Sequence, residues 1–433
     1  MLLFKTKVEV YKLKDYRLIL RVRYGIILQF YNMKKSILLA FFIFLFTYIS
    51  AVSRSKRIQS IPFEMVGSYV VVSVRINDSS PLNLILDSGI RNTIITELQP
   101  GDRISLNYSD VKDLMGLGGG NHLEAYTSNY NTLKIGKLKL DYKTVYVLQE
   151  DVFNLSKHTG TKINGLIGVD FFQDYTVEID YTGKRIRFYD PERYVIPKGY
   201  GMLPITVEAQ KLFVDLSVHQ ADSTRKQVKM LIDTGAELNA WFQTSTKESV
   251  HLPAKWINGT IGEGLNGLIT GKFGHIPQIC FGDFCLKNPI VSFPDSATIK
   301  GIIENSKRDG TIGSQLLSRF NIFLDYKNKK FYFKPNSTFS NHYSYNVAGI
   351  EIIQVTPIFT LTEVLDVWKN SPAALAGVQK EDQIIEINGE KAFGMTISEI
   401  RKVFETPSKR PLNLTLKRGD KEISVQIDMK DKI

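Results

Sequence analysis

Residues 84–89 read LILDSG and residues 230–235 read MLIDTG, so the chain contains one pattern twice. In each copy a short apolar stretch, which predicts a buried strand, ends at an aspartate followed by a hydroxyl residue and a glycine. The two aspartates, Asp87 and Asp233, are 146 positions apart. Two equivalent carboxylates from two similar halves are expected to meet at one shared centre.

Further segments repeat at nearly the same offset, which predicts two homologous lobes. They correspond at offsets of 142 to 146 and are 61–62 with 203–204, 116–118 with 262–264, 133–140 with 279–286, 164–168 with 309–313, and 177–181 with 322–326. The change from 142 to 146 falls in one expected hairpin, residues 77–81 in the first half and 220–226 in the second.

The positive charge of the chain is concentrated in its first 57 residues. The net charge is +11, and residues 1–57 contain twelve Lys or Arg against two Asp or Glu. The remaining chain is close to neutral, so no basic surface is available for a nucleic acid, and no nucleic-acid partner is expected.

Residues 1–57 are expected to be a leader. Two lysines after Met33 precede an apolar run over residues 37–52, as in a secretory signal, and Met33 is expected to be the true start. The run is shorter than the roughly 20 residues of a comfortable membrane span. Because the sequence near Ala51 matches a cleavage site poorly, a retained membrane anchor remains the alternative. Either way the protein is expected to be exported, to the periplasm or the extracellular space.

The two cysteines, Cys280 and Cys285, flank a Gly-Asp pair. If Gly282 and Asp283 form a two-residue hairpin turn, the cysteines lie directly opposite one another, where side chains approach most closely. An exported protein can form a disulfide there. Two free core thiols are the alternative. With two thiols and no histidine cluster, a zinc site is not expected, and no other metal or cofactor is predicted.

Residues 58–337 are predicted to be rich in strands, for example at 70–76 and 212–218, with short helical turns near 170–173 and 315–319. Residues 338–433 differ, because a capped helix ending at Gly377, a strand at 380–389 and an amphipathic helix at 396–405 precede a hairpin. The predicted boundaries are 58–196 for the first lobe, 197–337 for the second lobe and 338–433 for a separate domain.

Two neighbouring carboxylates repel each other when both are ionised, so Asp87 and Asp233 are expected to share one proton. The ionised member can take a proton from water, and the protonated member can polarise a carbonyl group. The neighbouring hydroxyls of Ser88 and Thr234 are expected to hold the opposite loop. The glycines that follow, Gly89 and Gly235, are expected to let the backbone turn sharply.

A glycine-rich segment in each half is predicted to be the tip of a hairpin that closes over a cleft. Its glycines are Gly116, Gly118, Gly119 and Gly120 in the first half and Gly262 and Gly264 in the second. A phosphate cradle does not fit, because no helix pattern and no closing lysine follow. A plain flexible loop is the alternative.

Residues 58–337 resemble an aspartic protease of the pepsin/retropepsin class with both catalytic motifs in one chain. Besides the two Asp-Ser/Thr-Gly motifs, the apolar-apolar-Gly element of the family matches residues 166–168 and 311–313, although Thr311 replaces an apolar residue. The resemblance implies an all-β, bilobal double β-barrel with an internal repeat. It also implies polypeptide substrates, no cofactor and a monomeric protease unit.

Residues 343–430 resemble a PDZ domain, an α+β fold, through Ser371-Pro-Ala and residues 382–389. In that family a peptide C-terminus adds as a strand beside the residues corresponding to 350–353, with helix 396–405 as the other wall. The carboxylate-binding loop corresponds to Val347, Ala348, Gly349 and Ile350. A domain that only packs on the protease or caps its cleft is the alternative.

The function predicted from the sequence is that of an exported aspartic endopeptidase whose PDZ-like domain recruits or gates peptide substrates. Neither a His-Glu-x-x-His zinc motif nor a Gly-x-Ser-x-Gly motif is present. The alternatives are a catalytically silent peptide-binding protein on a protease scaffold, and a scaffold or chaperone in which the PDZ-like domain is the functional part.

Overall fold

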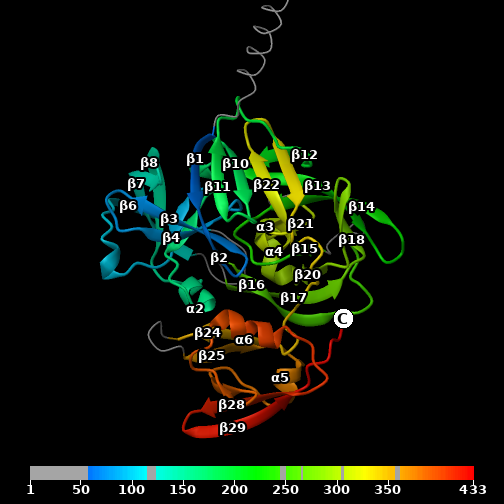
Figure 1. The fold of residues 1–433 in the computed structure, drawn as a ribbon. Helices are drawn as coiled ribbons and strands as arrows, with labels where there is room; N and C mark the ends of the chain where they lie inside the picture. Colours follow the sequence, from blue (N-terminus) through cyan, green and yellow to red (C-terminus); the bar gives the residue numbers. More distant parts are fainter. Residues whose placement is uncertain (1–56, 115–122, 244–249, 265–266, 304–306, 356–360) are drawn as a thin grey trace, which may run out of the picture. The chain divides into compact units, whose positions relative to one another are not determined.

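The computed structural model describes residues 57–114, 123–243, 250–264, 267–303, 307–355 and 361–433. The predicted leader and apolar run therefore lie outside the described residues. Among the helices within these ranges, none has the length and apolar character needed to cross a membrane. Residues 56–433 form one compact unit, and the elements described below belong to it (Figure 1).

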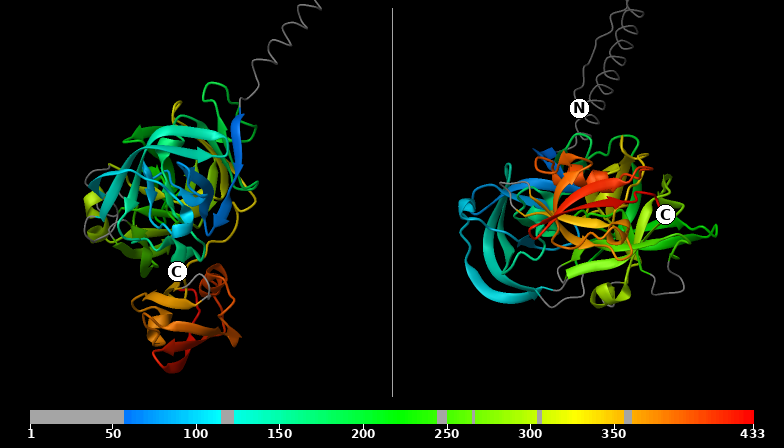
Figure 2. Two further views of the ribbon diagram at one scale, coloured as in Figure 1. Left: turned by 90° about the vertical axis from the view of Figure 1, so that its left-hand side faces the viewer. Right: turned by 90° about the horizontal axis from the view of Figure 1, so that it is seen from below.

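The first lobe is built on an eight-stranded sheet in the order β2-β3-β4-β9-β5-β8-β7-β6, which curls round so that β3 also pairs with β7. Its strands are β2 (Glu64–Val66), β3 (Tyr69–Ile76), β4 (Leu82–Leu86), β5 (Thr93–Ile95), β6 (Tyr108–Leu114), β7 (Leu123–Ile135), β8 (Leu138–Leu148) and β9 (Gly165–Ile167). The long β7–β8 hairpin, drawn in cyan, is strongly curved (Figure 2). Three short helices join them: η1 (Pro100–Asp102), α2 (Leu155–Thr159) and η2 (Val169–Phe171).

The second lobe repeats this arrangement. Its strands are β13 (Lys211–His219), β14 (Arg225–Ile232), β15 (Ala240–Phe242), β16 (Ile257–Gly264), β17 (Gly267–His275), β18 (Gln278–Phe281), β19 (Phe284–Lys287), β20 (Ile290–Pro294) and β21 (Gly310–Ile312), with helices α3 (Ser296–Ile303) and α4 (Ser314–Leu317). The helical turns predicted near 170–173 and 315–319 correspond to η2 and α4. Helices α2 and α3 were not predicted, because both are short and carry no clear apolar periodicity.

The register of the two lobes is the same at equivalent positions. In the first lobe Val71 pairs with Ile85, which pairs in parallel with Leu166. In the second lobe Phe213 pairs with Leu231, which pairs in parallel with Thr311. Each residue of the first lobe in this neighbourhood therefore has a defined counterpart in the second.

A shared sheet joins the lobes in the order β1-β11-β10-β22-β23-β12. Its strands are β1 (Arg57–Pro62), β10 (Thr176–Asp180), β11 (Arg185–Tyr189), β12 (Gly201–Glu208), β22 (Phe320–Asp325) and β23 (Lys330–Pro335). Equivalent strands of the two lobes, β10 and β22, pair antiparallel at its centre. One large hydrophobic cluster runs through both lobes and this sheet, so the lobes are joined at their base by shared packing as well as by strand pairing. The predicted bilobal all-β fold is confirmed.

Residues Cys280 and Cys285 face one another across β18 and β19 and are joined as a disulfide. The turn between the strands is the Gly282-Asp283 pair, and Gly282 has a φ of 55°. The positive φ suits glycine in a two-residue turn. The disulfide therefore links the two strands of a short hairpin in the second lobe.

The C-terminal region forms its own sheet in the order β24-β25-β26-β28-β29, with β27 beside β26. Its elements are β24 (Ile350–Gln354), β25 (Thr362–Val367), α5 (Pro372–Leu375), β26 (Gln383–Ile387), β27 (Glu390–Lys391), α6 (Ile397–Phe404), β28 (Leu412–Arg418) and β29 (Lys421–Ile427). A separate apolar cluster fills it. Thr396 caps α6 by accepting a hydrogen bond from the Glu399 N–H, and Glu399 accepts one from the Thr396 N–H in return.

Candidate active site

The two aspartates stand at the ends of equivalent strands, Asp87 directly after β4 and Asp233 directly after β14. The Asp87 N–H donates to the carbonyl of Ile167 at 3.0 Å, and the Asp233 N–H donates to that of Ile312 at 3.0 Å. The apolar-apolar-Gly segments singled out in the sequence therefore hold the backbone of each aspartate.

The neighbouring hydroxyl residues lock the lobes together. The N–H of Ser88 donates to Thr234 Oγ1 and the N–H of Thr234 donates to Ser88 Oγ, both at 3.0 Å. The Ser88 hydroxyl donates to the Ile232 carbonyl at 2.8 Å, and the Thr234 hydroxyl donates to the Leu86 carbonyl at 2.7 Å. Both hydroxyl residues are completely buried. These four bonds fix the two aspartate loops against each other.

The glycines after the hydroxyl residues lie under the opposite carboxyl group. The N–H of Gly89 donates to Asp87 Oδ1 at 2.7 Å, and the N–H of Gly235 donates to Asp233 Oδ1 at 3.1 Å. A Cβ atom on Gly89 would lie 2.5 Å from Asp233 Oδ2, and one on Gly235 would lie 2.3 Å from Asp87 Cγ. Only glycine leaves room for this approach, and the two carboxyl groups are brought together at the lobe interface.

Burial raises the pKa of both aspartates. The charge of Asp233 raises the pKa of Asp87 further, well above its usual range, while Arg308 and then Lys211 act against the rise at Asp233. The pair therefore keeps one proton over a broad pH range.

A cavity of about 660 Å³ opens over the pair, a volume within the usual range for ligand sites. Gly262, in β16, is part of its wall, and Gly264 ends that strand. The counterparts Gly116, Gly118, Gly119 and Gly120 lie outside the described residues. The cavity is lined by both lobes and by the C-terminal domain. The lobes contribute Tyr69, Ile85, Asp87, Tyr146, Leu166, Lys211, Leu231, Asp233, Trp241, Ile269 and Arg308 among others, and the C-terminal domain contributes residues such as Asn346, Glu351 and Trp368.

Sequence reasoning missed three charged residues at this site. Lys211 and Arg308 line the cavity beside Asp233. The repeat aligns Lys211 with Tyr69 and Arg308 with Ile163, and because neither of those residues is charged, the repeat gives no signal for a cation here. The third, Glu237, accepts a hydrogen bond from the Ser68 N–H of the first lobe at 3.0 Å. No motif marks that contact.

The predicted carboxylate-binding loop of the C-terminal domain already uses its amide groups. Ala348 N–H donates to the Phe404 carbonyl at 3.2 Å. Gly349 and Ile350 N–H both donate to Asn346 Oδ1, at 2.9 and 3.3 Å. The side chains of Val347, Ala348 and Ile350 point into the core and are buried. A peptide carboxylate can reach the amides of Gly349 and Ile350 only after Asn346 has turned away.

The C-terminal domain also contacts both lobes. The rings of Phe273 and Trp368 stack with centroids 5.4 Å apart and planes 6° apart, and Thr260 of β16 donates to Asp366 at 3.1 Å. Helix α2 of the first lobe lies against β24 and α6. A Cβ on Gly160, at the end of α2, would lie 2.7 Å from Gln354 Oε1 and 3.7 Å from Ile397 Cβ.

Comparison with known proteins supplies independent findings. The aspartyl protease family matches residues 72–171 and 214–316, and the PDZ domain family matches residues 363–418. Among solved structures, the aspartic proteinase from Irpex lacteus is similar at 14% identity, covering 65% of this chain and 98% of that one with a TM-score of 0.36. No curated protein matches the chain.

Within the described residues, no three His, Cys, Asp or Glu side chains are grouped to hold a metal ion.

Proposed function

Because the two lobes of this chain belong to the aspartyl protease family and are followed by a PDZ domain, we propose that it is an aspartic endopeptidase. The observation that carries the proposal is the pair Asp87 and Asp233. They come from equivalent strand ends, are locked together by four buried hydrogen bonds, and share one cavity.

The pair performs acid–base catalysis on a bound peptide. The ionised carboxylate, which we assign to Asp233 because the charge of Arg308 acts on it, takes a proton from a water molecule as the water oxygen adds to the carbonyl carbon of the peptide. The protonated carboxyl of Asp87 donates its proton to the carbonyl oxygen. When the C–N bond breaks, the proton held by Asp233 passes to the leaving amine and the hydroxyl proton of the intermediate returns to Asp87. No covalent enzyme intermediate forms.

The test is hydrolysis of a mixed peptide library by the parent protein and by Asp87→Asn and Asp233→Asn. We expect the parent to cleave and each variant to lose about a thousandfold in kcat/KM, because an amide can neither take the proton from water in place of Asp233 nor donate one to the carbonyl oxygen in place of Asp87. Variants must give the folded signal of the parent by near-ultraviolet circular dichroism. Full hydrolysis by either Asn variant would refute the mechanism. A folded parent that binds peptides without cleaving any would favour the peptide-binding alternative.

For the PDZ domain, we propose that it gates the protease by binding an extended peptide end. Strand β24 is an edge strand, which is where a peptide adds in β-augmentation. Helix α2 of the first lobe lies against β24 and α6, the two walls of that groove. A peptide that occupies the groove therefore competes with α2 and loosens the contact between the PDZ domain and the lobes.

Gating predicts two results. Peptides with a free aliphatic C-terminus should accelerate hydrolysis of a separate reporter substrate, and the same peptides amidated should not. Removal of residues 338–433 should leave peptide hydrolysis in place and abolish the acceleration. Loss of all hydrolysis after this deletion, with a folded remainder, would instead favour the PDZ domain as the functional part.

We propose that the protein acts after export, as a monomer, since one chain supplies both aspartates. The support for export is the pattern of residues 33–52, lysines followed by an apolar run. N-terminal sequencing of the mature protein distinguishes cleavage of the leader from a retained anchor, and light scattering measures the mass in solution.

A further inference from the structure

The cavity has two sides that are related by the repeat of the lobes, and their chemistry differs. Val66 pairs with Tyr69 across a two-residue turn in the first lobe, and Glu208 pairs with Lys211 across a two-residue turn in the second. Tyr69 and Lys211 are therefore equivalent positions, the first residues of β3 and β13.

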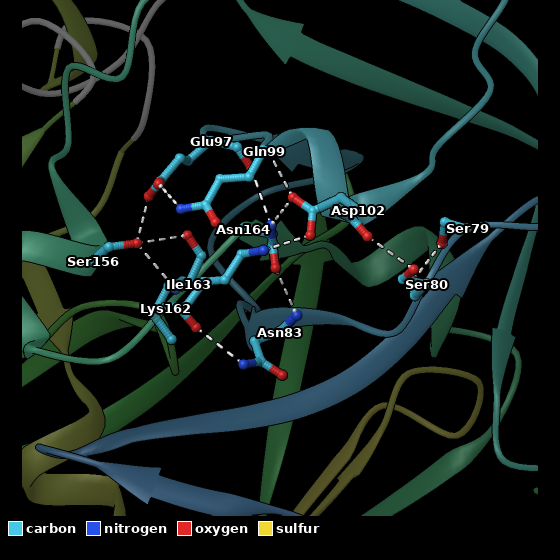
Figure 3. A network of polar contacts seen from close by, with 11 residues as sticks. Ser79, Ser80, Asn83, Glu97, Gln99, Asp102, Ser156, Lys162, Ile163 and Asn164 are labelled. Atoms are coloured by element: carbon cyan, nitrogen blue, oxygen red, sulfur yellow. Dashed lines mark hydrogen bonds and ion pairs between the residues drawn. The ribbon is translucent and has the colours of Figure 1, made fainter. Parts of the chain in front are cut away.

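A second pair of equivalent positions follows from the polar networks behind the aspartates. Asn164 accepts a hydrogen bond from the Asn83 N–H at 3.0 Å (Figure 3). In the same place of the second lobe, Asp309 accepts one from the Lys229 N–H at 2.7 Å. The residues just before these acceptors, Ile163 and Arg308, are thus counterparts.

On the first-lobe side these positions are filled by apolar groups. Ile163 belongs to a cluster with Val71, Ile85 and Leu166, against which Tyr69 packs. On the second-lobe side both positions carry a cation. The Arg308 guanidinium lies over the Trp241 ring at 5.2 Å, and only 6% of the residue is exposed. Lys211 is half-buried beside it.

In the part of the chain that the structure describes, the two cations have no carboxylate partner of their own. Among the described residues Arg308 and Lys211 form no ion pair with a carboxylate, and Arg308 Nε is buried without a hydrogen-bond partner. The carboxylates that act on them are those of the catalytic pair. Burial lowers the pKa of Arg308 to about 10, so it stays charged at neutral pH. A singly protonated pair supplies one negative charge against two positive charges.

A buried, unpaired guanidinium is costly unless something completes its hydrogen bonds. In the cleft of a protease, a carboxylate of the substrate is a suitable group, because arginine binds carboxylates with a forked geometry. We propose that Lys211 and Arg308 form an anion-binding subsite that selects an acidic side chain of the substrate on one side of the scissile bond. The apolar counterpart beside Tyr69 selects an apolar side chain on the other.

This inference rests on the proposed protease function, and it has a definite rival. The two cations could serve only to stabilise the negative charge of the aspartate pair. In that case their removal would shift the pH profile of hydrolysis without changing which peptides are preferred.

The experiment compares peptides that differ only as Glu and Gln at single positions around one cleaved bond, at neutral pH. The ratio of kcat/KM for the Glu and Gln peptides is the readout, because it is independent of overall activity. At one position we expect the parent to favour Glu by about 10- to 100-fold, the range for a hydrogen bond to a charged group. Peptides with a free or an amidated C-terminus separate side-chain recognition from recognition of a terminal carboxylate.

The double variant Lys211→Tyr, Arg308→Ile installs the first-lobe residues and should bring the ratio to one or below. Arg308→Lys keeps a cation but loses the forked geometry, so it should retain part of the preference. Lys287→Tyr, an exposed lysine outside the cavity, is the matched control and should leave the ratio unchanged. A parent ratio near one at every position, or a double variant that keeps the preference, would overturn the proposal.

Binding to the Asp87→Asn variant, measured by calorimetry with the same peptides, separates this inference from the protease function. If the parent cleaves nothing but the variant binds Glu peptides more tightly than Gln peptides, the protease function fails and the subsite stands. If Glu and Gln peptides bind equally, or neither binds, the subsite fails.

Discussion

The hydrogen bonds of the Thr234 hydroxyl give a quantitative test of how the aspartates are held. In Thr234→Val a methyl group replaces a completely buried hydroxyl. The N–H of Ser88 loses its acceptor and the carbonyl of Leu86 loses its donor. At about 1–3 kcal/mol for each buried group left unsatisfied, the free energy of unfolding should fall by about 2–6 kcal/mol. Peptide hydrolysis should fall as well, because the two aspartate loops are no longer locked together.

The chain offers a matched control for this change. Thr311 is 1% exposed and its hydroxyl is buried without a hydrogen-bond partner in the described part of the chain. Thr311→Val makes the same substitution one strand away, and it should change the free energy of unfolding by no more than about 1 kcal/mol, in the stabilising direction.

The assay is urea denaturation of both variants and the parent, followed by tryptophan fluorescence, since Trp241 is buried in the second lobe. The midpoint should move at constant slope, which shows that stability and not the extent of unfolding has changed. Equal stability of Thr234→Val and parent, or an equal loss in Thr311→Val, would refute the reasoning.

Three further predictions concern other parts of the molecule. Burial raises the pKa of Asp87, so the folded protein keeps this proton to higher pH than the unfolded protein does, and the stability that the protonated Asp87 contributes falls as the pH rises above about 4. Asp87→Asn does not titrate, so in urea titrations its free energy of unfolding should rise relative to that of the parent between pH 4 and 7.5. A difference that shrinks over this interval would contradict a raised pKa. Replacing Cys280 and Cys285 by serine should lower the free energy of unfolding by at most about 2 kcal/mol, because the loop that the disulfide closes is short. A variant that fails to fold would show that the disulfide does more than restrict the unfolded chain. Trp368→Ala removes the stack on Phe273 and should raise the rate on protein substrates about 2- to 10-fold, from the usual strength of an aromatic pair; an unchanged rate in a kinetic assay would count against gating.

Much of the fold was predictable because it depends on local pattern. The strands at 70–76 and 212–218 match β3 and β13, and the amphipathic helix at 396–405 matches α6. Each of these elements buries one face, so its apolar residues recur with the period of a strand or of a helix, and that period can be recognised within the segment itself. Helix α2, with five residues and none buried, leaves no such pattern and was missed.

The residues of the candidate active site likewise fall into those that the local sequence predicts and those that it does not. The Asp-Ser/Thr-Gly motifs were readable because their backbone turn, hydroxyl lock and glycine contact require fixed residue types at adjacent positions. Lys211 and Arg308 were not readable, because a cation in a β-rich sequence looks the same whether it faces solvent or a cavity. The occupied amides of the loop at 347–350 were hidden too, since Asn346 is an ordinary loop residue by sequence.

The sequence by itself predicted the duplication, the two aspartates with their supporting residues, and the change of fold type near residue 338, because each depends on periodicity or on a short motif. Only the tertiary structure decided what surrounds the pair: which cations lie beside Asp233, which residues occupy the equivalent positions of the first lobe, and which helix lies against β24 and α6. Those properties depend on contacts between residues far apart in the chain, whose distances and burial are set by the packing of the lobes and by no single segment.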